Sequence, residues 1–455
     1  MMRAMSLAEL QAPLSGQLVG DDYSFSSVVT DSRSIERGAL FVALQGENFD
    51  GHEFVPAAAR AGAGAALVSR ELDVALPQLQ VEDTQRALGL LGAYNREQFQ
   101  GMLVAITGSS GKTTVKNMVS AILSRRGKTL ATEGNFNNEI GVPLTLLRLE
   151  PEYEFAVVEM GAAALGDIRW LCQLGRPAVS LLLNAMPAHL EGFGSLEQVA
   201  MAKGEIFDGL GKGDVAVINA DQPWAAAWRE RAGAANVIDF SVEGEAQVSL
   251  LRQSSLGIEG AQFTVQTPLG DCDIGLALPG QHNVANALAA IAVGLACELT
   301  LDEIREGLAS VRPVAGRLSA SRNKAGTLVI DDCYNANPGS VRAAIDTLAV
   351  SGGRRTLVLG AMRELGANSA ALHRASGEYA RDAGLERFWG VGEELREAVA
   401  AFGAGGRWFA DCAAAVQALP GQFDSEDVVL IKGSRGARME RVLQGLTSRN
   451  GAGEA

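Results

Sequence analysis

The stretch Met102-Leu103-Val104-Ala105-Ile106-Thr107-Gly108-Ser109-Ser110-Gly111-Lys112-Thr113-Thr114 decides the fold. It begins with an apolar run of strand length and continues into a glycine loop. After the loop, apolar residues recur at the spacing of one helix face: Val115, Met118, Val119, Ile122 and Leu123. Gly127 then stands where a helix is expected to end. The sequence therefore predicts strand, loop and helix, the unit from which parallel α/β sheets are built.

The glycine loop has the composition of a phosphate-binding loop. Its glycines let backbone N–H groups turn toward phosphate oxygens, and the helix N-terminus adds positive potential. The standard eight-residue pattern has a glycine where Ile106 stands, so this loop is a shortened relative. A glycine turn capping an ordinary helix is the alternative, which the strand before and the helix after disfavour. We expect ATP to bind at Gly108, Ser109, Ser110, Gly111, Lys112, Thr113 and Thr114.

Working outward from this unit, further strand-like runs predict three α/β domains. A helical stretch, Gln85–Arg96, precedes the loop strand, and a more alternating region, Val248–Leu278, predicts a hairpin at a sheet edge. The other expected strands are Leu40–Leu44, Ala65–Val68, Phe155–Val158, Val179–Leu183, Val215–Ile218, Thr327–Ile330, Thr356–Leu359, Phe388–Val391 and Val428–Ile431. We expect a small N-terminal α/β domain (1–84), a central P-loop ATPase-like domain with a mostly parallel sheet (85–313) and a C-terminal Rossmann-like domain (314–455).

Composition excludes several functional classes. At 455 residues the chain is long enough for about three domains, and its 47% hydrophobic residues can fill their cores. A formal net charge of -14 argues against broad binding to nucleic acid or anionic lipid. The five cysteines form no C-x-x-C pair, so neither a zinc site nor a disulfide framework is indicated. No stretch approaches the 18 apolar residues of a membrane span, and we expect a cytoplasmic protein without membrane insertion.

Polar residues follow several predicted strands, where open α/β sheets place ligand chemistry. Glu159 follows Phe155–Val158 and could hold magnesium, although a lone glutamate is more often a solvated or capping residue. His189 lies just past another strand, and Asp331 to Pro338 gathers acids and amides in one loop. Asn283 and Asn286 share a helix face and suit a base or sugar, or simply cap the helix.

These motifs, in this order, resemble those of the Mur ligases, which extend the peptide of the peptidoglycan precursor and share their fold with folylpolyglutamate synthase. The resemblance covers nearly the whole chain. Its four motifs are the phosphate loop Thr107–Thr114, the magnesium glutamate Glu159, the site histidine His189 and the adenine-side run from His282 to Asn286.

Within the family, three stretches resemble the member that adds D-alanyl-D-alanine: Gly134–Asn138, Asp332–Pro338 and Lys432–Arg435. The resemblance implies that ATP phosphorylates the terminal carboxylate of UDP-N-acetylmuramoyl-tripeptide, and that the dipeptide amine attacks the acyl phosphate. The implied substrate-binding residues are Ser32, Arg33, Asn135, Asn138 and Asn335. Ala361 stands where related sequences often carry an acid, so no role is assigned there.

The resemblance also implies the remaining roles in the site. Thr113 and Glu159 would hold Mg²⁺, and His189 with Lys203, carried as a carbamate, would serve a second ion. Lys112 and Arg317 would neutralise the γ-phosphate. Asn283 would face the adenine and Asp332 the ribose.

Two alternatives remain open at this point, and the sequence does not decide every feature. Folylpolyglutamate synthase uses the same chemistry but leaves the N-terminal unit unexplained, and a nucleotide-binding regulator would hold ATP without making an amide. We expect a monomer, although the sequence does not reveal the oligomeric state or the third residue of the tripeptide.

Overall fold

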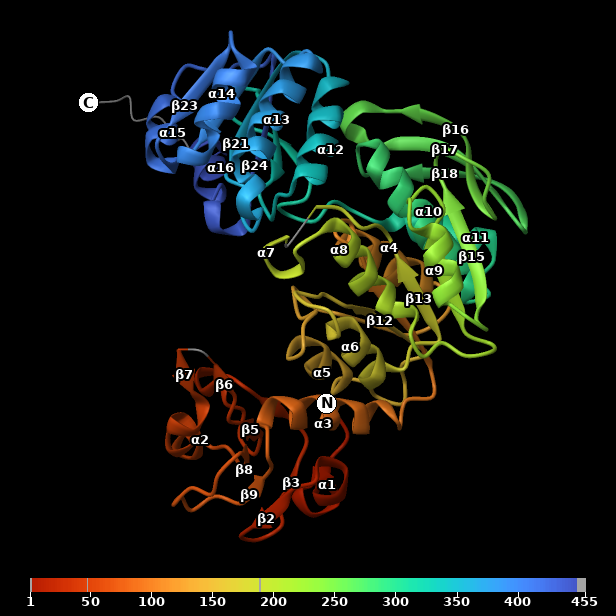
Figure 1. Cartoon of the computed structure of the whole chain (residues 1–455), viewed down its shortest axis with the longest axis vertical. Helices are drawn as coiled ribbons and strands as arrows, with labels where there is room; N and C mark the ends of the chain where they lie inside the picture. Colours follow the sequence, from red (N-terminus) through yellow and green to blue (C-terminus); the bar gives the residue numbers. More distant parts are fainter. Residues whose placement is uncertain (1, 47, 188–189, 448–455) are drawn as a thin grey trace.

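The computed structural model describes residues 2–46, 48–187 and 190–447, arranged as three α/β units (Figure 1). In Figure 1 the N-terminal unit (red and orange) lies at the bottom, the central unit (yellow and green) lies to its upper right, and the C-terminal unit (blue) lies at the top. His189 and nearly all of the tail from Thr447 to Ala455 lie outside the described residues. No helix in the described ranges has the length and apolarity that crossing a bilayer requires.

The N-terminal unit is built on a five-stranded sheet. Its order is β2-β9-β8-β5-β4, with only β2 antiparallel to its neighbour. The sheet strands are β2 (Gln17–Val19), β4 (Val28–Val29), β5 (Leu40–Val42), β8 (Ala65–Val68) and β9 (Gln78–Gln80). Four two-residue strands lie outside it: β1 (Met5–Ser6), β3 (Ser24–Phe25), β6 (Gln45–Gly46) and β7 (Phe49–Asp50). The helices are α1 (Leu7–Leu14), α2 (Val55–Ala61) and α3 (Thr84–Arg96).

The central unit contains a nine-stranded sheet in the order β11-β12-β10-β13-β14-β15-β16-β17-β18. Strands β11 to β16 run parallel, and β16, β17 and β18 form an antiparallel edge. The strands are β10 (Met102–Thr107), β11 (Thr129–Ala131), β12 (Phe155–Glu159), β13 (Val179–Leu182), β14 (Val215–Asn219), β15 (Asn236–Ser241), β16 (Val248–Ser255), β17 (Ala261–Thr267) and β18 (Gly270–Leu276). The helices are α4 (Lys112–Leu123), α5 (Gly141–Leu146), α6 (Asp167–Gly175), α7 (Leu190–Phe193), α8 (Leu196–Gly204), α9 (Ala225–Arg231), α10 (Gln281–Ala296) and α11 (Leu301–Ser310).

The C-terminal unit has a six-stranded sheet in the order β19-β20-β24-β21-β22-β23, in which only β19 is antiparallel. The strands are β19 (Ser319–Arg322), β20 (Leu328–Asp332), β21 (Arg354–Gly360), β22 (Arg387–Val391), β23 (Gly406–Phe409) and β24 (Asp427–Lys432). The helices are α12 (Pro338–Ala349), α13 (Ser369–Asp382), α14 (Arg396–Phe402), α15 (Cys412–Ala418) and α16 (Glu440–Thr447).

The expected three-unit α/β architecture is confirmed, and the strand that opens the phosphate loop has the predicted bounds. The edge hairpin is also present, as β16 to β18. Helix α4 ends at Leu123, one turn before Gly127, and its apolar face is fully buried against the sheet. In the central and C-terminal units, sequence reasoning missed four strands that are short or carry polar residues: β11, β15, β19 and β23. In the N-terminal unit it predicted only β5 and β8 and missed the other, two- to three-residue strands.

Helix α3 joins the first two units. Leu88 and Leu91 pack in the N-terminal core, whereas Asn95 donates to the carbonyl oxygens of Leu146 and Leu149 at 2.9 and 3.1 Å. One helix thus packs in both cores, and we place the first boundary near its start. We propose the domain limits 1–84, 85–313 and 314–455.

The order of the central strands fixes where ligand chemistry can occur. β10 lies between β12 and β13. The strands that follow it in the chain therefore lie on both of its sides, with β11 and β12 on one side and β13 and β14 on the other. A crevice forms at such a switch point in open α/β sheets. The phosphate loop follows β10, Glu159 ends β12 and Asn184 follows β13, which brings three polar segments to one edge.

Candidate active site

The loop between β10 and α4 is shaped by one glycine. Gly111 has φ of +84°, a left-handed conformation that costs a glycine little. A Cβ at this position would lie 2.6 Å from Oδ1 of Asn286 on α10, so the loop and the start of α10 can approach only because Gly111 has no side chain. Asn286 in turn donates to Asn283 Oδ1 at 3.0 Å, and Asn283 donates to the Pro279 carbonyl at 2.7 Å.

The first half of the loop is held by Asn184, which sequence reasoning did not single out. Its Oδ1 accepts the backbone N–H groups of Ser109 and Ser110 at 3.1 and 3.0 Å, and its Nδ2 donates to the Ser110 carbonyl at 3.2 Å. Ser109 also exchanges hydrogen bonds with the backbone of Met186, at 2.9 and 3.2 Å. The amides of Ser109 and Ser110 are therefore engaged by protein, and the next four residues, from Gly111 to Thr114, line the cavity at the helix start.

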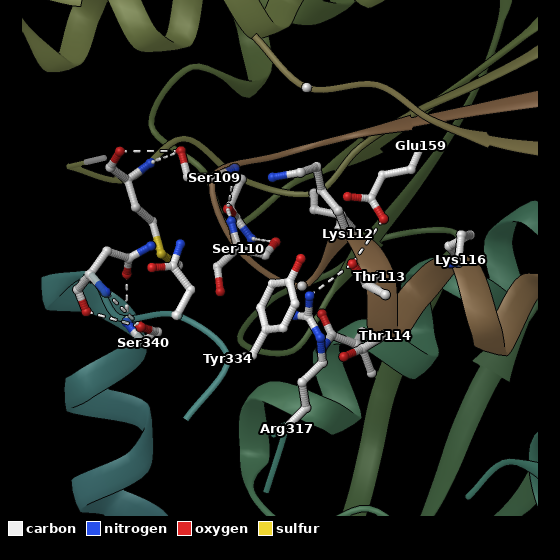
Figure 2. A pocket seen from close by; sticks show the side chains of 18 of the residues that line it. Ser109, Ser110, Lys112, Thr113, Thr114, Lys116, Glu159, Arg317, Tyr334 and Ser340 are labelled. Carbon is white, nitrogen blue, oxygen red and sulfur yellow. Dashed lines mark hydrogen bonds between the residues drawn. The ribbon is translucent and has the colours of Figure 1, made fainter. Parts of the chain in front are cut away.

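The second half of the loop meets residues from elsewhere in the central unit and from the C-terminal unit (Figure 2). The Thr113 hydroxyl donates to Glu159 at 2.8 Å and accepts from the Arg317 guanidinium at 2.9 Å. Arg317 lies 204 residues after Thr113, and its guanidinium stacks on the Tyr334 ring at 4.1 Å. Asn137 donates to the other oxygen of Glu159 at 2.8 Å. The central and C-terminal units thus meet at the phosphate loop.

Two lysines share the floor of this site. The Lys112 ammonium donates to the Gly108 carbonyl at 2.7 Å, and burial lowers its pKa, although nearby Glu159 opposes that shift. Lys203, at the end of α8, is only 2% exposed. Burial and the Lys112 charge lower the pKa of Lys203 to about 7, so far more of its amine is neutral at neutral pH than in an exposed lysine.

The C-terminal sheet contributes a buried ion pair. Asp332 ends β20 and Lys432 ends β24, and the parallel register places them opposite each other. Lys432 Nζ donates to Asp332 Oδ2 at 2.6 Å and to the Asn335 carbonyl at 3.0 Å. Burial raises the pKa of the Asp332 carboxyl, and the Lys432 ammonium opposes that rise. Both residues of the pair line the cavity described next.

One cavity of about 1050 Å³ brings most predicted site residues together. Its wall includes Ser109, Ser110, Gly111, Lys112, Thr113, Thr114, Asn135, Asn138, Glu159, Lys203, Asn283, Arg317, Asp332 and Asn335. Gly108 is not in the wall, and a Cβ there would lie 2.9 Å from Leu183. The cavity therefore joins the phosphate loop to the C-terminal sheet.

Besides Gly108, two predicted residues that the structure describes are not part of this wall. Ser32 and Arg33 lie in a 3₁₀ turn of the N-terminal unit, Ser32–Ser34, where the exposed Arg33 pairs with Asp31 at 2.6 Å. His189 lies outside the described residues. Asn138, although in the wall, accepts the N–H of Gly141 at 2.9 Å and so also stabilises the start of α5.

Several wall residues were missed by sequence reasoning. Lys116 is 5% exposed, and its ammonium donates to the Thr132 carbonyl at 2.6 Å. Lys116 lies one helical turn after Lys112, a spacing that could have identified it. Asn184 follows a strand end, as Glu159 does, and the same positional argument would have found it.

The donors present suit a hard divalent cation. Mg²⁺ prefers oxygen ligands and keeps several waters, and the Thr113 hydroxyl and Glu159 carboxylate lie 2.8 Å apart at the cavity wall. Among the described residues no group of three histidine, cysteine or acidic side chains could hold a metal ion. The oxygen set fits magnesium bound mainly through nucleotide phosphates and water rather than an all-protein cage.

The chain was compared with known proteins. Models of the Mur ligase family match three stretches: the catalytic domain model at residues 24–96, the middle domain at 106–294 and the glutamate ligase domain at 316–435. The UDP-N-acetylmuramoyl-tripeptide–D-alanyl-D-alanine ligase of Escherichia coli (strain K12) is 47% identical, and the alignment covers 98% of this chain and 99% of that protein.

Two solved structures extend this similarity. Crystal structure I of MurF from Acinetobacter baumannii has a TM-score of 0.93 at 36% identity, over 98% of this chain and 100% of that one. MurF ligase from Thermotoga maritima in complex with ADP has a TM-score of 0.82 at 30% identity, over 92% and 96% of the two chains. Sequence motifs, site geometry and full-length similarity agree: the chain belongs to the Mur ligase family.

Proposed function

We propose that this protein joins D-alanyl-D-alanine to UDP-N-acetylmuramoyl-tripeptide in an ATP-dependent reaction that passes through an acyl phosphate and releases ADP and phosphate. The contact that carries the proposal is Arg317 reaching from the C-terminal unit to Thr113 of the phosphate loop, beside Glu159. A cation and a carboxylate meet at the loop hydroxyl, as phosphoryl transfer requires. The full-length similarity to ligases of this name supports the substrate pair.

The chemistry explains why these groups are needed. A carboxylate is a poor electrophile, whereas an acyl phosphate has a good leaving group, so two lower barriers replace one high one. Lys112 and Arg317 neutralise charge on the transferred phosphoryl group. Asn283 faces the adenine, and the Asp332 carboxylate accepts from the ribose. The nucleotide is then gripped by the central and C-terminal units together, and domain closure completes the site.

Magnesium would be held by Thr113 and Glu159, with His189 and Lys203 serving a second ion. When bound, the ions supply positive charge that offsets the charge on the phosphates. Asn137 keeps the Glu159 carboxylate oriented by donating to the oxygen that does not accept from Thr113.

Lys203 serves as a ligand only after it reacts with carbon dioxide. Its neutral amine adds to the carbon of CO₂, a proton leaves, and the product is a carbamate anion with two oxygens. The lowered pKa of about 7 supplies the neutral amine that this addition needs.

Lys203→Ala should be nearly inactive and partly restored by a small carboxylate at high concentration. Lys203→Arg should remain inactive, and an arginine variant working at the parental rate would refute the ligand role.

The peptide precursor would span the first two units. Ser32 and Arg33 hold its UDP end in the N-terminal unit, and Asn135 and Asn138 contact it nearer the phosphate loop. Asn335 lies on the dipeptide side of the cavity. We propose that the protein acts as a monomer. We place the reaction in the cytoplasm, where ATP is available and thiols such as the five free cysteines stay reduced.

The proposal is tested by the requirement for all three substrates. Phosphate release should need ATP, the UDP-sugar tripeptide and D-alanyl-D-alanine together, since the amine must consume the acyl phosphate before turnover continues. A plain ATPase would release phosphate from ATP alone. A folylpolyglutamate synthase would use folate and glutamate instead.

A further inference from the structure

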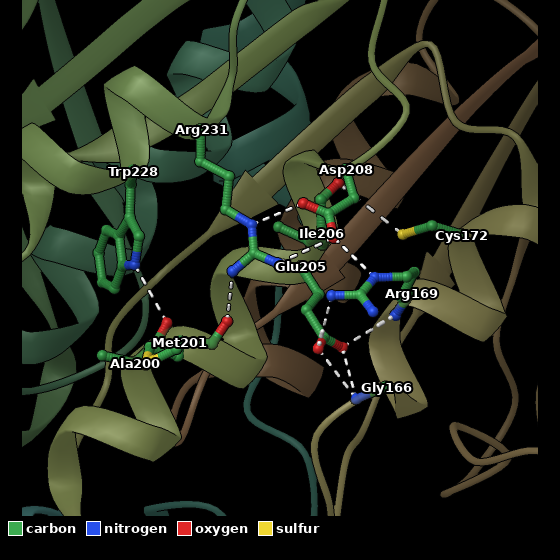
Figure 3. A network of polar contacts seen from close by, with 10 residues as sticks. All are labelled: Gly166, Arg169, Cys172, Ala200, Met201, Glu205, Ile206, Asp208, Trp228 and Arg231. Atoms are coloured by element: carbon green, nitrogen blue, oxygen red, sulfur yellow. Dashed lines mark hydrogen bonds and ion pairs between the residues drawn. The ribbon is translucent and has the colours of Figure 1, made fainter.

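A network of charged side chains connects the helix that carries Lys203 to the loop that follows Glu159 (Figure 3). Glu205 lies two residues after Lys203 and is 1% exposed. Its carboxylate accepts the backbone N–H of Gly166 at 2.9 and 3.0 Å and that of Arg169 at 3.2 Å. The Arg169 guanidinium adds an ion pair at 3.3 Å.

These contacts make Glu205 the cap of helix α6. The first N–H groups of a helix have no partner within the helix, and its N-terminus carries partial positive charge. Gly166, at the cap position, has φ of +96° and provides no side-chain hydrogen bond. A buried carboxylate 39 residues farther along the chain satisfies that end instead. Glu205, two residues after Lys203, thereby holds the loop between Glu159 and α6.

The end of α8 is fixed from its other side by α9. Trp228 donates to the Ala200 carbonyl at 3.2 Å, and Arg231 donates to the Met201 carbonyl at 2.6 Å. The Met201 carbonyl belongs to the last turn of α8, whose carbonyls lack partners within the helix. A Cβ at Gly204 would lie 3.2 Å from both the Arg231 and Trp228 side chains, so α9 packs directly on this turn.

Asp208 closes the network. It accepts from Arg231 at 2.6 and 2.8 Å and from Arg169 at 2.9 Å. The ion pairs therefore run from α9 through the segment after α8 to the start of α6. Lys203 itself has no hydrogen-bond partner among the described residues, so its position is set by the backbone turn that this network holds.

We propose that Glu205 is a positioning residue: by capping α6 from the turn after α8, it sets Lys203 at a fixed place relative to Glu159. This inference rests on the proposed carbamate role of Lys203. Outer groups that orient metal ligands typically affect metal affinity or activity by about 10- to 100-fold. Glu205 is not among the residues that line the cavity, so it acts only through the ligand it places.

The test uses Glu205→Gln, which keeps the side-chain size but removes the charge and one acceptor oxygen. Arg169→Met is the second variant, because it removes the ion pair between α6 and Glu205 from a half-exposed position and is less disruptive to folding. Glu197→Gln is the matched control, the same substitution at an exposed position of α8, the helix that precedes Glu205. Thermal melting establishes that each variant is folded.

Two readouts separate positioning from general stability: the ¹³C NMR signal of the carbamate in ¹³CO₂-equilibrated enzyme, and calorimetric Mn²⁺ binding in the presence of ADP. We expect both to weaken in Glu205→Gln and Arg169→Met, with Mn²⁺ affinity falling by about 10- to 100-fold, while Glu197→Gln matches the parent. If either folded variant keeps the parental carbamate signal and the parental Mn²⁺ affinity, the positioning role of Glu205 is overturned while the ligand role of Lys203 stands. A parent without any carbamate signal would overturn the ligand role of Lys203, and the positioning role with it.

Discussion

Replacing Lys432 with methionine should destabilise the C-terminal domain far more than loss of an ordinary surface ion pair. The Lys432 ammonium lies 2.6 Å from Asp332, and the two side chains are 3% and 13% exposed. At an effective dielectric constant of about 20, Coulomb's law gives an attraction of about 6 kcal/mol at this separation. Desolvation offsets part of it, and removal of one partner of a buried pair costs about 3–5 kcal/mol.

The expected loss depends on pH in a defined direction. Burial raises the pKa of Asp332, and Lys432→Met removes the cation that opposes this rise. The folded variant therefore holds a proton more tightly than the unfolded chain does, so its free energy of unfolding increases as the pH falls. The destabilisation should be largest at alkaline pH and shrink on acidification, because Asp332 can then become neutral.

Hydrogen exchange of the amides in β24 measures the local free energy of opening. The control is Arg374→Met, which removes an exposed i,i+4 pair with Glu378 and should cost about 0.3–0.5 kcal/mol. The double variant Lys432→Met/Asp332→Asn should recover most of the stability, since no buried charge is left alone. Its affinity for ADP should remain below that of the parent, because Asp332→Asn removes the carboxylate proposed to accept from the ribose. The reasoning is refuted if Lys432→Met costs no more than Arg374→Met, or if the double variant is no more stable than the single one.

Three further predictions follow from the site. Lys112→Ala should lower turnover by several orders of magnitude, about 10³-fold or more, while the melting temperature stays close to parental; near-normal phosphate release would exclude this loop as the ATP site. Asn184→Ala removes the side-chain hydrogen bonds to the Ser110 N–H and carbonyl and leaves the Ser109 N–H only the backbone carbonyl of residue 184, so it should weaken ADP binding, measured by calorimetry, more than binding of the UDP-sugar tripeptide; an equal loss for both ligands would contradict the role of Asn184 in ordering the loop. Burial and the Lys432 charge lower the pKa of His282 from 6.5 to about 4, so on acidification the unfolded chain binds a proton that the folded one does not. Between pH 7 and pH 5 the parent should therefore lose about 2 kcal/mol more stability than His282→Gln, and equal losses in urea unfolding would show that His282 titrates normally.

The strand and loop around Lys112 could be predicted because their signals are local. A six-residue apolar run, a glycine loop and a one-face helix lie within about two dozen consecutive residues, and the structure reproduces them. The edge hairpin was predicted for the same reason, from alternation within one segment.

The polar contacts across the site could not be predicted in this way. The contact between Arg317 and Thr113 joins residues 204 positions apart, and it exists only because two domains meet at a strand end. The pairing of Asp332 with Lys432 depends on the parallel register of β20 and β24. Glu205 looks in sequence like any glutamate near a helix end, and only the fold shows that it caps another helix. Such roles are set by tertiary packing rather than by local pattern.

The central claim is that a carboxylate is activated by ATP and then joined to an amine, and isotope transfer tests it directly. UDP-sugar tripeptide labelled with ¹⁸O in its terminal carboxylate is incubated with ATP, magnesium and D-alanyl-D-alanine, and phosphate and nucleotide product are analysed by mass spectrometry. We predict one ¹⁸O atom in each released phosphate and a UDP-sugar pentapeptide heavier by the dipeptide minus water. A pentapeptide formed with no label in the phosphate would contradict the acyl-phosphate route, and phosphate released without pentapeptide would contradict the ligase itself.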